Sequence, residues 1–508
     1  MAELTVQMLE NEYWWAGYVS RGHEMPYHKA SVCSFDLNGE EGNDQFMPLM
    51  LSSKGRYIWS EDPFRADIAG GTITLYGSDD LKLYEGYENL RGAYLSACQA
   101  HFPFSGSLPA PEFFKMPQYN TWIEVGADQT TEKILAYAKG ILKNGMPAGV
   151  LMIDGGWHEA FGMYEEFNRR KVPDPKYLVD ELHRMGFKVM VWVSPIVDAA
   201  GPVYEKIRDM GFLIRNRDGE IAIRKWWSGY SAVMDFSNPE AVSWQCEMLD
   251  SLRERYGVDG FKFDAGDGYF YEDDDIIFRT MKGRHQTAEF NKLGLYYPFN
   301  EFRAAWKFGG QAIAARLQDK FHCWDTEGLA ALIPHTLAQG LSGYAYCCPD
   351  MVGGGQIADV NNSAFRYDEE LFVRWAQVNA LMGMMQISRS PWKALSPLYA
   401  EKVKQAIRLH ASLGEEIYAL AEQSAKTGEP ITRHMAYAFP DEGFETVNDQ
   451  FMLGDRILSA PVLTKGAVTR IVKLPKGRWQ YVDGTVYEGG VTVTVPADID
   501  TIPYFVRA

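Results

Sequence analysis

The sequence predicts an α/β protein in which a (β/α)8 TIM barrel lies between an N-terminal β-sandwich and a small C-terminal β domain. Two observations lead to this fold class. Through the middle of the chain, apolar strand patterns alternate with helical patterns, as parallel βαβ units require. On either side, short alternating segments are separated by Gly, Asn, Asp and Pro, which is typical of β domains. A chain of 508 residues has room for about two to four domains.

The two flanking β domains are predicted from short strands without long helical periodicity. The N-terminal β-sandwich is expected over residues 1–116, where segments such as Thr72–Tyr76 alternate apolar and polar side chains. The Pro-rich passage Phe102–Pro117 has the composition of a linker. The C-terminal β-sandwich is expected over residues 429–508, with segments such as Arg470–Leu474 between Gly and Pro.

The barrel is predicted over residues 117–428. An open doubly wound sheet is the alternative, but it leads us to expect a Gly-rich phosphate loop, and the sequence contains no GxGxxG or Walker pattern. The predicted strands are Thr121–Gly126, Ala148–Asp154, Phe187–Pro195, Ala232–Phe236, Gly260–Asp264, Gln311–Leu317 and Gly343–Cys348. The predicted helices are Glu132–Lys143, Pro175–Met185, Tyr204–Met210, Pro239–Tyr256, Leu371–Met382 and Pro397–Lys426.

Composition and charge exclude several classes of partner. A net charge of −17 and a pI near 5.1 argue against nucleic acid and anionic membranes. The N-terminus has no basic start and no continuous apolar run, and no segment approaches the roughly 20 apolar residues that span a bilayer. Six cysteines without CxxC spacing indicate reduced thiols in a cytoplasmic protein. The histidines form neither HxxxH nor HExxH, so we expect no metal and no other cofactor.

Carboxylates follow several of the apolar strands. In GFKFDAGD, residues 260–267, the strand delivers Asp264 at its carboxyl end, which is the end that faces the active site of a barrel. Asp154 and Asp235 follow two other apolar strands in the same way. One such carboxylate is commonly a solvated cap, but three together indicate a site. For Asp235 a turn into a capped helix is an equal alternative, because it begins the sequence DFSNP.

An acid-rich site without a metal motif or phosphate loop fits glycoside hydrolysis by a carboxylate pair. One carboxylate attacks the sugar, and a protonated one donates to the leaving oxygen. Lys262 lies two residues before Asp264, so the strand's period of two places both on one face. An ammonium there would lower the pKa of Asp264, as a nucleophile requires, whereas the alternative is an exposed lysine. The 14 Trp and 28 Tyr fit either a large core or stacking platforms for a sugar.

Several longer motifs stand in the sequence from about Tyr119 to the end of the chain. They are IDGGW at 153–157, FKVMVWVSP at 187–195, DFSNP at 235–239, GVDGFKFDAGD at 257–267 and DQFMLGDRILSAPV at 449–462. Together these motifs resemble those of glycoside hydrolase family 31, the retaining α-glycosidases with a β-sandwich, a (β/α)8 barrel and C-terminal β domains. The KFDAG form is especially similar to the branch that contains myogenesis-regulating glycosidase and certain bacterial α-galactosidases.

The resemblance implies the catalytic pair. Asp264 corresponds to the nucleophile. The family's acid/base aspartate lies sixteen residues beyond a substrate-binding arginine and five before a tryptophan, and Arg303, Asp319 and Trp324 meet both intervals. The sequence RLQDK lacks the family's more common glycine before and asparagine after this aspartate. Nearby acids that the intervals reject are Asp325, Glu327 and Asp350.

The resemblance also implies which residues bind the sugar. Asp154 corresponds to a residue that binds the distal hydroxyls, and Trp192 to a wall of the pocket. Trp227, with Trp226 in the sequence KWWSG, matches a pocket segment but could equally lie in the core. The complete set of predicted substrate-binding residues is Asp154, Trp157, Trp192, Trp227, Lys262, Arg303 and Trp324.

One departure from the family pattern bears on the substrate. Many α-glucosidases of the family place a sugar-binding histidine fourteen residues after an Arg-Trp pair, whereas Arg374-Trp375 here leads to Gln386-Ile387-Ser388. Together with Trp157 in IDGGW, this implies a retaining, exo-acting α-galactosidase for terminal α-linked sugars. The alternatives are an α-glucosidase, an α-xylosidase or a transglycosylase on the same residues. A non-catalytic carbohydrate-binding protein on a decayed barrel is a further alternative, against which the intact carboxylate pair argues.

Overall fold

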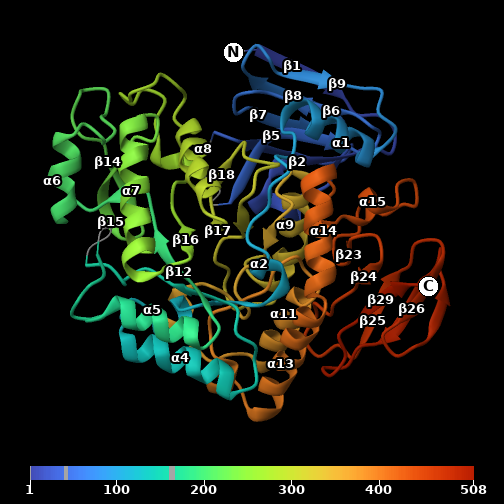
Figure 1. Cartoon of the computed structure of the whole chain (residues 1–508). Coiled ribbons are helices and arrows are strands. Elements are labelled where there is room, and N and C mark those ends of the chain that lie inside the picture. The colour runs from blue at the N-terminus through green and yellow to red at the C-terminus, as the bar shows by residue number, and fades with distance from the viewer. Residues whose placement is uncertain (1, 39–43, 160–165) are drawn as a thin grey trace.

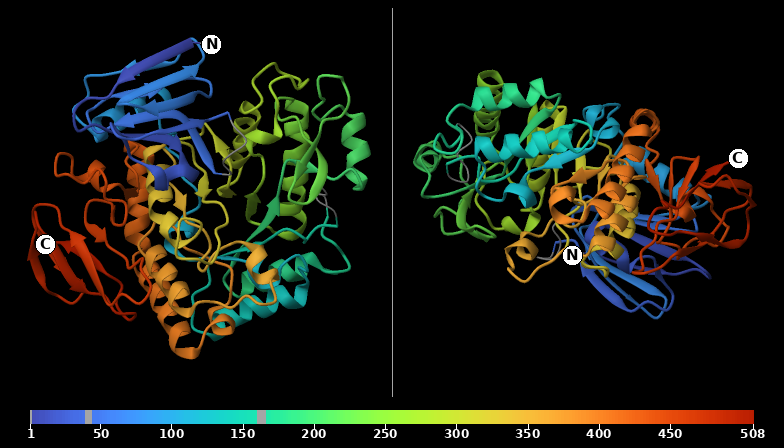
Figure 2. Two further views of the ribbon diagram at one scale, coloured as in Figure 1. Left: turned by 180° about the vertical axis from the view of Figure 1, so that it is seen from behind. Right: turned by 90° about the horizontal axis from the view of Figure 1, so that it is seen from below.

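The structure, a computed structural model, describes residues 2–38, 44–159 and 166–508. A central parallel barrel contacts an N-terminal sheet domain (blue) and a C-terminal β domain (red), as Figure 1 and the two further views of Figure 2 show. The predicted fold class is therefore confirmed. Among the described residues, no helix is both long enough and apolar enough to cross a membrane.

Eight short parallel strands follow one another around the barrel in chain order. Lys262 pairs with Trp192 on one side and Glu301 on the other, which fixes the register around the predicted nucleophile strand. The sheet ends meet at a seam, where the backbone N–H of Val352 donates to the carbonyl of Gln386 at 2.8 Å. The strands are β10 (Gln118–Asn120), β11 (Val150–Ile153), β12 (Lys188–Val193), β16 (Gly260–Phe263), β17 (Phe299–Phe302), β19 (Ala314–Arg316), β20 (Cys347–Cys348) and β21 (Gln386–Ile387).

Helices cover the outside of the barrel, so its strands are buried on both faces and mostly apolar. A Cβ on Gly260 would lie 1.9 Å from the carbonyl oxygen of Phe299, so only glycine lets β16 pair closely with β17 there. The Asn238 side chain caps the helix α7, which ends at the left-handed Gly257. The main helices are α4 (Thr131–Lys143), α5 (Pro175–Arg184), α7 (Pro239–Tyr256), α8 (His285–Lys292), α9 (Leu329–Leu341), α11 (Glu369–Asn379), α13 (Pro397–Ser412) and α14 (Gly414–Thr427).

Three predicted elements of the barrel differ in the structure. The first strand is β10, and the predicted strand Thr121–Gly126 instead contains the short helix α3 (Trp122–Val125). The segment Ala232–Phe236 belongs only in part to a strand, β15 (Gly229–Val233). That strand lies outside the barrel in an antiparallel sheet with β13 (Ile196–Val197) and β14 (Ile223–Trp226), next to helix α6 (Pro202–Asp209). The predicted helix Pro397–Lys426 is two helices, because a turn at Leu413 separates α13 from α14.

The N-terminal domain contains two sheets, which pack through aromatic contacts such as Phe35 with Tyr18. It also contains the helix α1 (Leu90–His101), which was not predicted and whose N-cap is the side chain of Asn89. One sheet has the order β1 (Ala2–Gln7), β8 (Thr72–Gly77), β7 (Arg65–Ala69), β4 (Cys33–Asp36). The other has the order β3 (Tyr27–His28), β2 (Tyr13–Tyr18), β5 (Gln45–Ser52), β6 (Tyr57–Trp59), β9 (Lys82–Tyr84).

The Pro-rich segment predicted as a linker connects the N-terminal domain to the barrel, and it is packed against the rest of the protein. Phe102–Pro117 contains the helix α2 (Glu112–Lys115), in which Phe113 and Phe114 are fully buried. Lys115 forms an ion pair with Glu415 on α14 at 2.8 Å. The proline content therefore predicted the irregular backbone of this segment, but it did not predict that the segment is packed.

The C-terminal domain is held against the barrel by the helix α11. The buried guanidinium of Arg374 donates to the backbone carbonyls of Ala467, Ala497 and Asp498. The larger sheet of this domain has the order β22 (Thr432–Arg433), β23 (Phe451–Leu453), β24 (Ile457–Ser459), β29 (Tyr504–Arg507), β26 (Arg478–Tyr481), β27 (Val486–Glu488). A separate pair consists of β25 (Thr469–Lys473) and β28 (Thr492–Pro496).

Candidate active site

Asp264 follows β16 directly and is almost completely buried, with 9% of its surface exposed. Its Oδ1 accepts hydrogen bonds from Arg303 Nε at 2.8 Å and from the backbone N–H of Ala265 at 2.8 Å. Its Oδ2 accepts from the Trp192 indole at 2.9 Å. Ala265 has a left-handed backbone (φ 57°), which is uncommon for a residue with a Cβ and marks a constrained turn at this position.

The charges around Asp264 keep it ionised. Burial alone would raise its pKa, but the nearby cations Arg303, Lys262 and Arg316 outweigh this effect and hold the pKa well below the usual range of an aspartate. A carboxylate that stays ionised inside a protein is available to attack an electron-poor carbon. This environment matches the role predicted for Asp264 in the sequence.

Arg303, just beyond β17, joins Asp264 to a second carboxylate. Its Nη1 and Nη2 atoms donate to the two oxygens of Asp267 at 2.8 and 2.7 Å, in the bidentate geometry that fixes a guanidinium plane. Asp267 is fully buried behind this contact. Arg303 thus has a second carboxylate partner in addition to Asp264.

Lys262 and Asp154 form a buried ion pair inside the barrel, with 2.6 Å between Lys262 Nζ and Asp154 Oδ2. Burial would lower the pKa of Lys262, but the charge of Asp154 outweighs it and raises that pKa. The alternative of an exposed lysine is therefore wrong. Lys262 faces the barrel interior because it shares a strand face with Asp264, as the period of two predicted.

Asp319 lies in the loop after β19, and its side chain is 30% exposed. Its Oδ1 accepts from Arg316 Nη1 at 2.8 Å, and Arg316 is one of the cations that act on Asp264. The rejected alternative Asp350 is fully buried, and Asp325 accepts from its own exposed turn at the backbone of Glu327. A proton donor must reach its substrate, so this exposure favours Asp319 over Asp350.

Three charged members of the site were not predicted: Arg316, Glu301 and Asp267. Arg316 lies on β19 with its Nε 3.2 Å from Glu301 Oε1 on β17, and both side chains are buried. The signal in the sequence was a charge inside a short apolar strand, which is the same signal that identified Lys262. Asp267 lies within the GFKFDAGD segment and could have been identified as the second carboxylate of that turn.

The predicted aromatic residues divide into two groups. Trp192 bonds to Asp264, and Trp227 is 54% exposed with the Arg303 guanidinium 5.4 Å from its ring centre. Trp157 has no exposed surface and donates to the Trp192 carbonyl at 2.8 Å, a placement that favours support of Trp192 over contact with substrate. Trp324 donates to Asp368, the N-cap of α11, rather than to the carboxylate cluster.

Asp235 has a structural role, because its carboxylate accepts several hydrogen bonds from neighbouring segments. Its oxygens accept from the backbone and hydroxyl of Ser237, from the amide of Gln286 and from the backbone N–H of Phe278. These bonds tie the loop before α7 to α8 and to the segment that precedes α8. Of the two alternatives for this residue, the structure supports the turn that leads into a capped helix.

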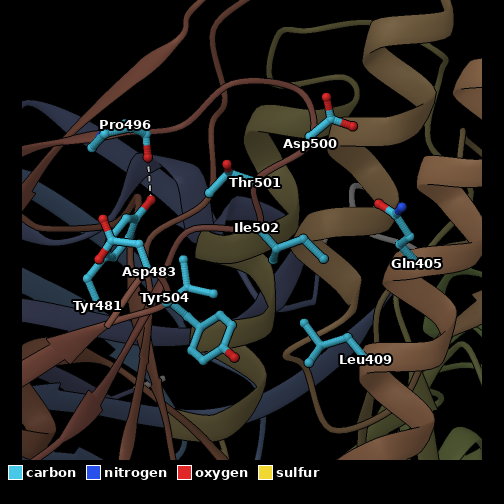
Figure 3. A pocket seen from close by; sticks show the side chains of 10 residues that line it. Gln405, Leu409, Tyr481, Asp483, Pro496, Asp500, Thr501, Ile502 and Tyr504 are labelled. Carbon is cyan, nitrogen blue, oxygen red and sulfur yellow. Dashed lines mark hydrogen bonds between the residues drawn. The ribbon is translucent and has the colours of Figure 1, made fainter. Parts of the chain in front are cut away.

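A separate cavity of about 420 Å³ lies between α13 and the C-terminal sheet, as Figure 3 shows. Leu409 of α13 and the tyrosines Tyr481 and Tyr504 contribute to its wall. None of the predicted site residues lines it. The candidate site is therefore the cluster of charged side chains at the carboxyl ends of the barrel strands.

A (β/α)8 barrel with an ionised carboxylate and a partly exposed one at its strand ends has the arrangement that glycoside hydrolysis requires. Residues 116–420 match the model of the glycosyl hydrolases family 31 TIM-barrel domain, and residues 428–508 match that of the family 31 C-terminal domain. The chain belongs to glycosyl hydrolase family 31, and the resemblance predicted from its motifs is confirmed.

Individual proteins similar to the chain carry several activities in their names. Myogenesis-regulating glycosidase of Mus musculus is 31% identical over a similarity that covers 80% of this chain and 58% of that protein. Alpha-xylosidase XylQ of Lactiplantibacillus pentosus is 27% identical over a similarity that covers 94% of this chain and 65% of that protein. The chain thus spans less than two thirds of either relative.

Solved structures agree with the fold. A family 31 α-xylosidase from a soil metagenome, complexed with xylose, superposes with a TM-score of 0.85 over 99% of this chain and 79% of that one. The two sequences are 19% identical, so this likeness concerns the fold.

Proposed function

We propose that the chain is a retaining, exo-acting α-glycosidase with Asp264 as nucleophile and Asp319 as acid/base. The observation that carries this proposal is that Asp264 and Asp319 both lie near Arg316 but in different surroundings. Asp264 is buried among cations that favour its ionised form, whereas Asp319 bonds to the same arginine from a partly exposed position. Two carboxyl groups with such different environments suit opposite roles in one reaction.

In the first step, Asp264 attacks the anomeric carbon and forms a glycosyl ester, while Asp319 gives its proton to the departing oxygen. The attack removes the negative charge of Asp264. Arg303 remains compensated because Asp267 holds it through two hydrogen bonds. Asp319 becomes anionic beside Arg316, whose guanidinium stabilises the new charge.

In the second step, Asp319 removes a proton from water, and the resulting hydroxide attacks the anomeric carbon and releases Asp264 as a carboxylate. Two inversions at that carbon retain the α configuration. Arg303, Lys262 and Arg316 favour departure of the Asp264 carboxylate because they stabilise its ionised form.

A crystal structure with a bound sugar is expected to place the carboxyl groups of Asp264 and Asp319 roughly 5–5.5 Å apart, the spacing of retaining glycosidases. The measurement is the mean separation of the carboxyl oxygens in the closed, liganded enzyme. A separation near 9 Å would leave room for a water between acid and base and would indicate inversion instead.

We further propose that the first subsite prefers galactose. The histidine of many family α-glucosidases is absent, because the fourteen-residue interval from Arg374 ends at Ser388, whose buried hydroxyl donates to the Asn120 carbonyl at 2.9 Å. Gln386, two residues before it, is fully buried with its amide 2.7 Å from Glu301 Oε2. Gln386 thus stabilises the barrel interior. The proposed preference for galactose is supported by the absence of the histidine donor rather than by a new contact to the sugar. The buried Asp154–Lys262 pair supplies a carboxylate and an ammonium for the distal hydroxyls of the sugar.

Nitrophenyl α-galactoside is expected to be turned over with a kcat/KM on the order of 10⁴-fold higher than nitrophenyl α-glucoside, because an axial 4-hydroxyl meets a different wall from an equatorial one and a mismatch leaves buried polar groups unpaired. Steady-state kinetics on both substrates, with the xyloside and N-acetylgalactosaminide alongside, measure this ratio. Equal or better hydrolysis of the glucoside would replace the galactosidase proposal with the α-glucosidase alternative, for which relatives named alpha-glucosidase and alpha-xylosidase already provide the precedent.

A further inference from the structure

A buried carboxyl group that the proposed reaction does not use lies beside the proposed acid. Asp350 follows β20 and has no exposed surface. Its Oδ1 is 3.2 Å from Arg316 Nη1, the same nitrogen that donates to Asp319 Oδ1 at 2.8 Å. A Cβ on Gly355 would lie 2.8 Å from Asp350 Oδ1 and 3.1 Å from Asp319 Oδ1, so both oxygens border one small space.

The backbone fixes Asp350 in this position. Its Oδ2 accepts from the N–H of Lys320 at 2.7 Å and from the N–H of Gly355 at 3.0 Å. Lys320 is the residue after Asp319, and Gly355 belongs to the loop after β20. Asp350 therefore ties together the loop that carries the acid and the loop that faces it.

The charges around the two carboxyl groups are unequal. Arg316 forms ion pairs with three carboxyl groups, namely Glu301, Asp319 and Asp350. The buried ammonium of Lys320 also lowers the pKa of Asp350. Burial and the neighbouring Asp319 raise the pKa of Asp350 to about 7. Two carboxyl groups that contact the same guanidinium nitrogen and repel each other in this way bind protons as a pair rather than independently.

We propose that Asp350 is a positioning residue that shares one proton with Asp319 across Arg316 and so sets the pH range in which Asp319 can act as the acid. This inference rests on the proposed glycosidase function. Whether the shared proton resides on Asp350 or on Asp319, an uncharged side chain at 350 weakens the pair's hold on it. If the proton resides on Asp350, the variant loses the group that binds it. If the proton resides on Asp319, the variant loses the negative charge of Asp350 that favours the protonated form of Asp319.

The Asp350→Asn variant is therefore expected to move the basic limb of the kcat/KM profile to lower pH, by on the order of one pH unit. The substrate must have a poor leaving group, such as an alkyl glycoside, because its first step needs the acid. A nitrophenyl glycoside of the same sugar needs little protonation, so its basic limb should stay in place. A residue that only supports the fold would lower both rates without separating the two profiles.

A second variant gives the opposite sign. Lys320→Met keeps the backbone N–H that donates to Asp350 but removes a cation that favours the ionised pair. The pair then holds its proton to higher pH, so the basic limb for the alkyl glycoside should move upward. An unmoved limb in Lys320→Met would overturn the proposal even if Asp350→Asn does not fold.

Asp359→Asn is the matched control, because Asp359, on the short helix α10 (Ile357–Asn361) that follows the loop after β20, also accepts from a backbone N–H, here that of His322 at 2.8 Å. It should leave the limb unchanged. If folded Asp350→Asn and Lys320→Met both retain the wild-type limb, Asp350 has no such role and the glycosidase proposal stands. If the wild type hydrolyses none of the aryl glycosides, the proposed function itself fails.

Discussion

Asp264→Asn is expected to lower turnover of every α-glycoside by at least about 10⁴-fold, whatever the leaving group, because no nucleophile remains to form the glycosyl ester. The variant should fold. Arg303 keeps its two bonds to Asp267, and the asparagine oxygen can still accept one hydrogen bond at the position of Asp264. Steady-state rates on nitrophenyl and alkyl glycosides, with thermal unfolding measured on the same preparation, give the result.

Asp259 provides a control on the same strand segment. It lies just before β16, at the opposite end from Asp264, and accepts from the Val189 backbone and from Lys188. Asp259→Asn removes the same charge outside the site, so it should lower stability rather than turnover. Residual activity above a thousandth of the wild type in Asp264→Asn, after exclusion of contaminating wild type, would show that another group is the nucleophile.

Asp319→Asn is expected to separate substrates by leaving group. Alkyl glycosides should lose about 10²–10⁴-fold in kcat/KM because their oxygen needs a proton as it departs. Nitrophenyl glycosides should nearly retain the rate of the first step and accumulate the glycosyl-enzyme, since the second step then lacks its base. Pre-steady-state release of nitrophenol measures the first step directly.

Asp325→Asn is the matched control for that experiment. Asp325 lies six residues further along the same loop and accepts from the Glu327 backbone. Its replacement should leave both classes of substrate unaffected. Equal losses on activated and unactivated substrates in Asp319→Asn, together with a leaving-group dependence in Asp325→Asn, would transfer the acid role to Asp325.

The sequence predicted the barrel well where strands were mostly apolar and where helical periods ran for ten residues or more. The strands β11, β12 and β16 and the helices α4, α5 and α7 lie where their patterns placed them. The last part of the barrel was harder because its strands β20 and β21 have two residues each, too few to show a period. The strand β17 (FNEF) was missed because the charge of Glu301 interrupts its apolar pattern, although that charge faces a polar barrel interior.

The site was predictable where one strand carried the information. Lys262 and Asp264 share a face of β16, so the strand's period alone placed the ammonium in the same environment as the carboxylate. Contacts between strands were not predictable in this way. Arg316, Glu301 and Asp350 come from three different strands or their following loops, and only the closed barrel brings them together. The burial of Trp157 behind Trp192 has the same origin, because it depends on side-chain packing that a motif does not specify.

The chain after β17 leaves the barrel and enters the N-terminal domain. The strand β18 (Ala305–Trp306) pairs with β5 of that domain, beside residues Gln45 and Phe46. Arg303 lies at the crossing between the two sheets. The side chain of Gln45 donates to the backbone carbonyls of Arg303 and, at 2.9 Å, of Arg316. The adjacent Asp44 accepts from the backbone N–H of Gln318, one residue before Asp319.

Both ends of the reaction centre are thus anchored to a domain that supplies none of its proposed reacting groups. The N-terminal domain holds two segments in place: Arg303, which positions the proposed nucleophile, and the loop at Gln318, which positions the proposed acid. A displacement of the N-terminal domain by about 1 Å would misalign the proposed nucleophile and the proposed acid together. Errors of this size cost on the order of 10²-fold in rate. Exchange of this domain for that of a relative therefore has to preserve Asp44 and Gln45 in place, even though neither residue takes part in bond making.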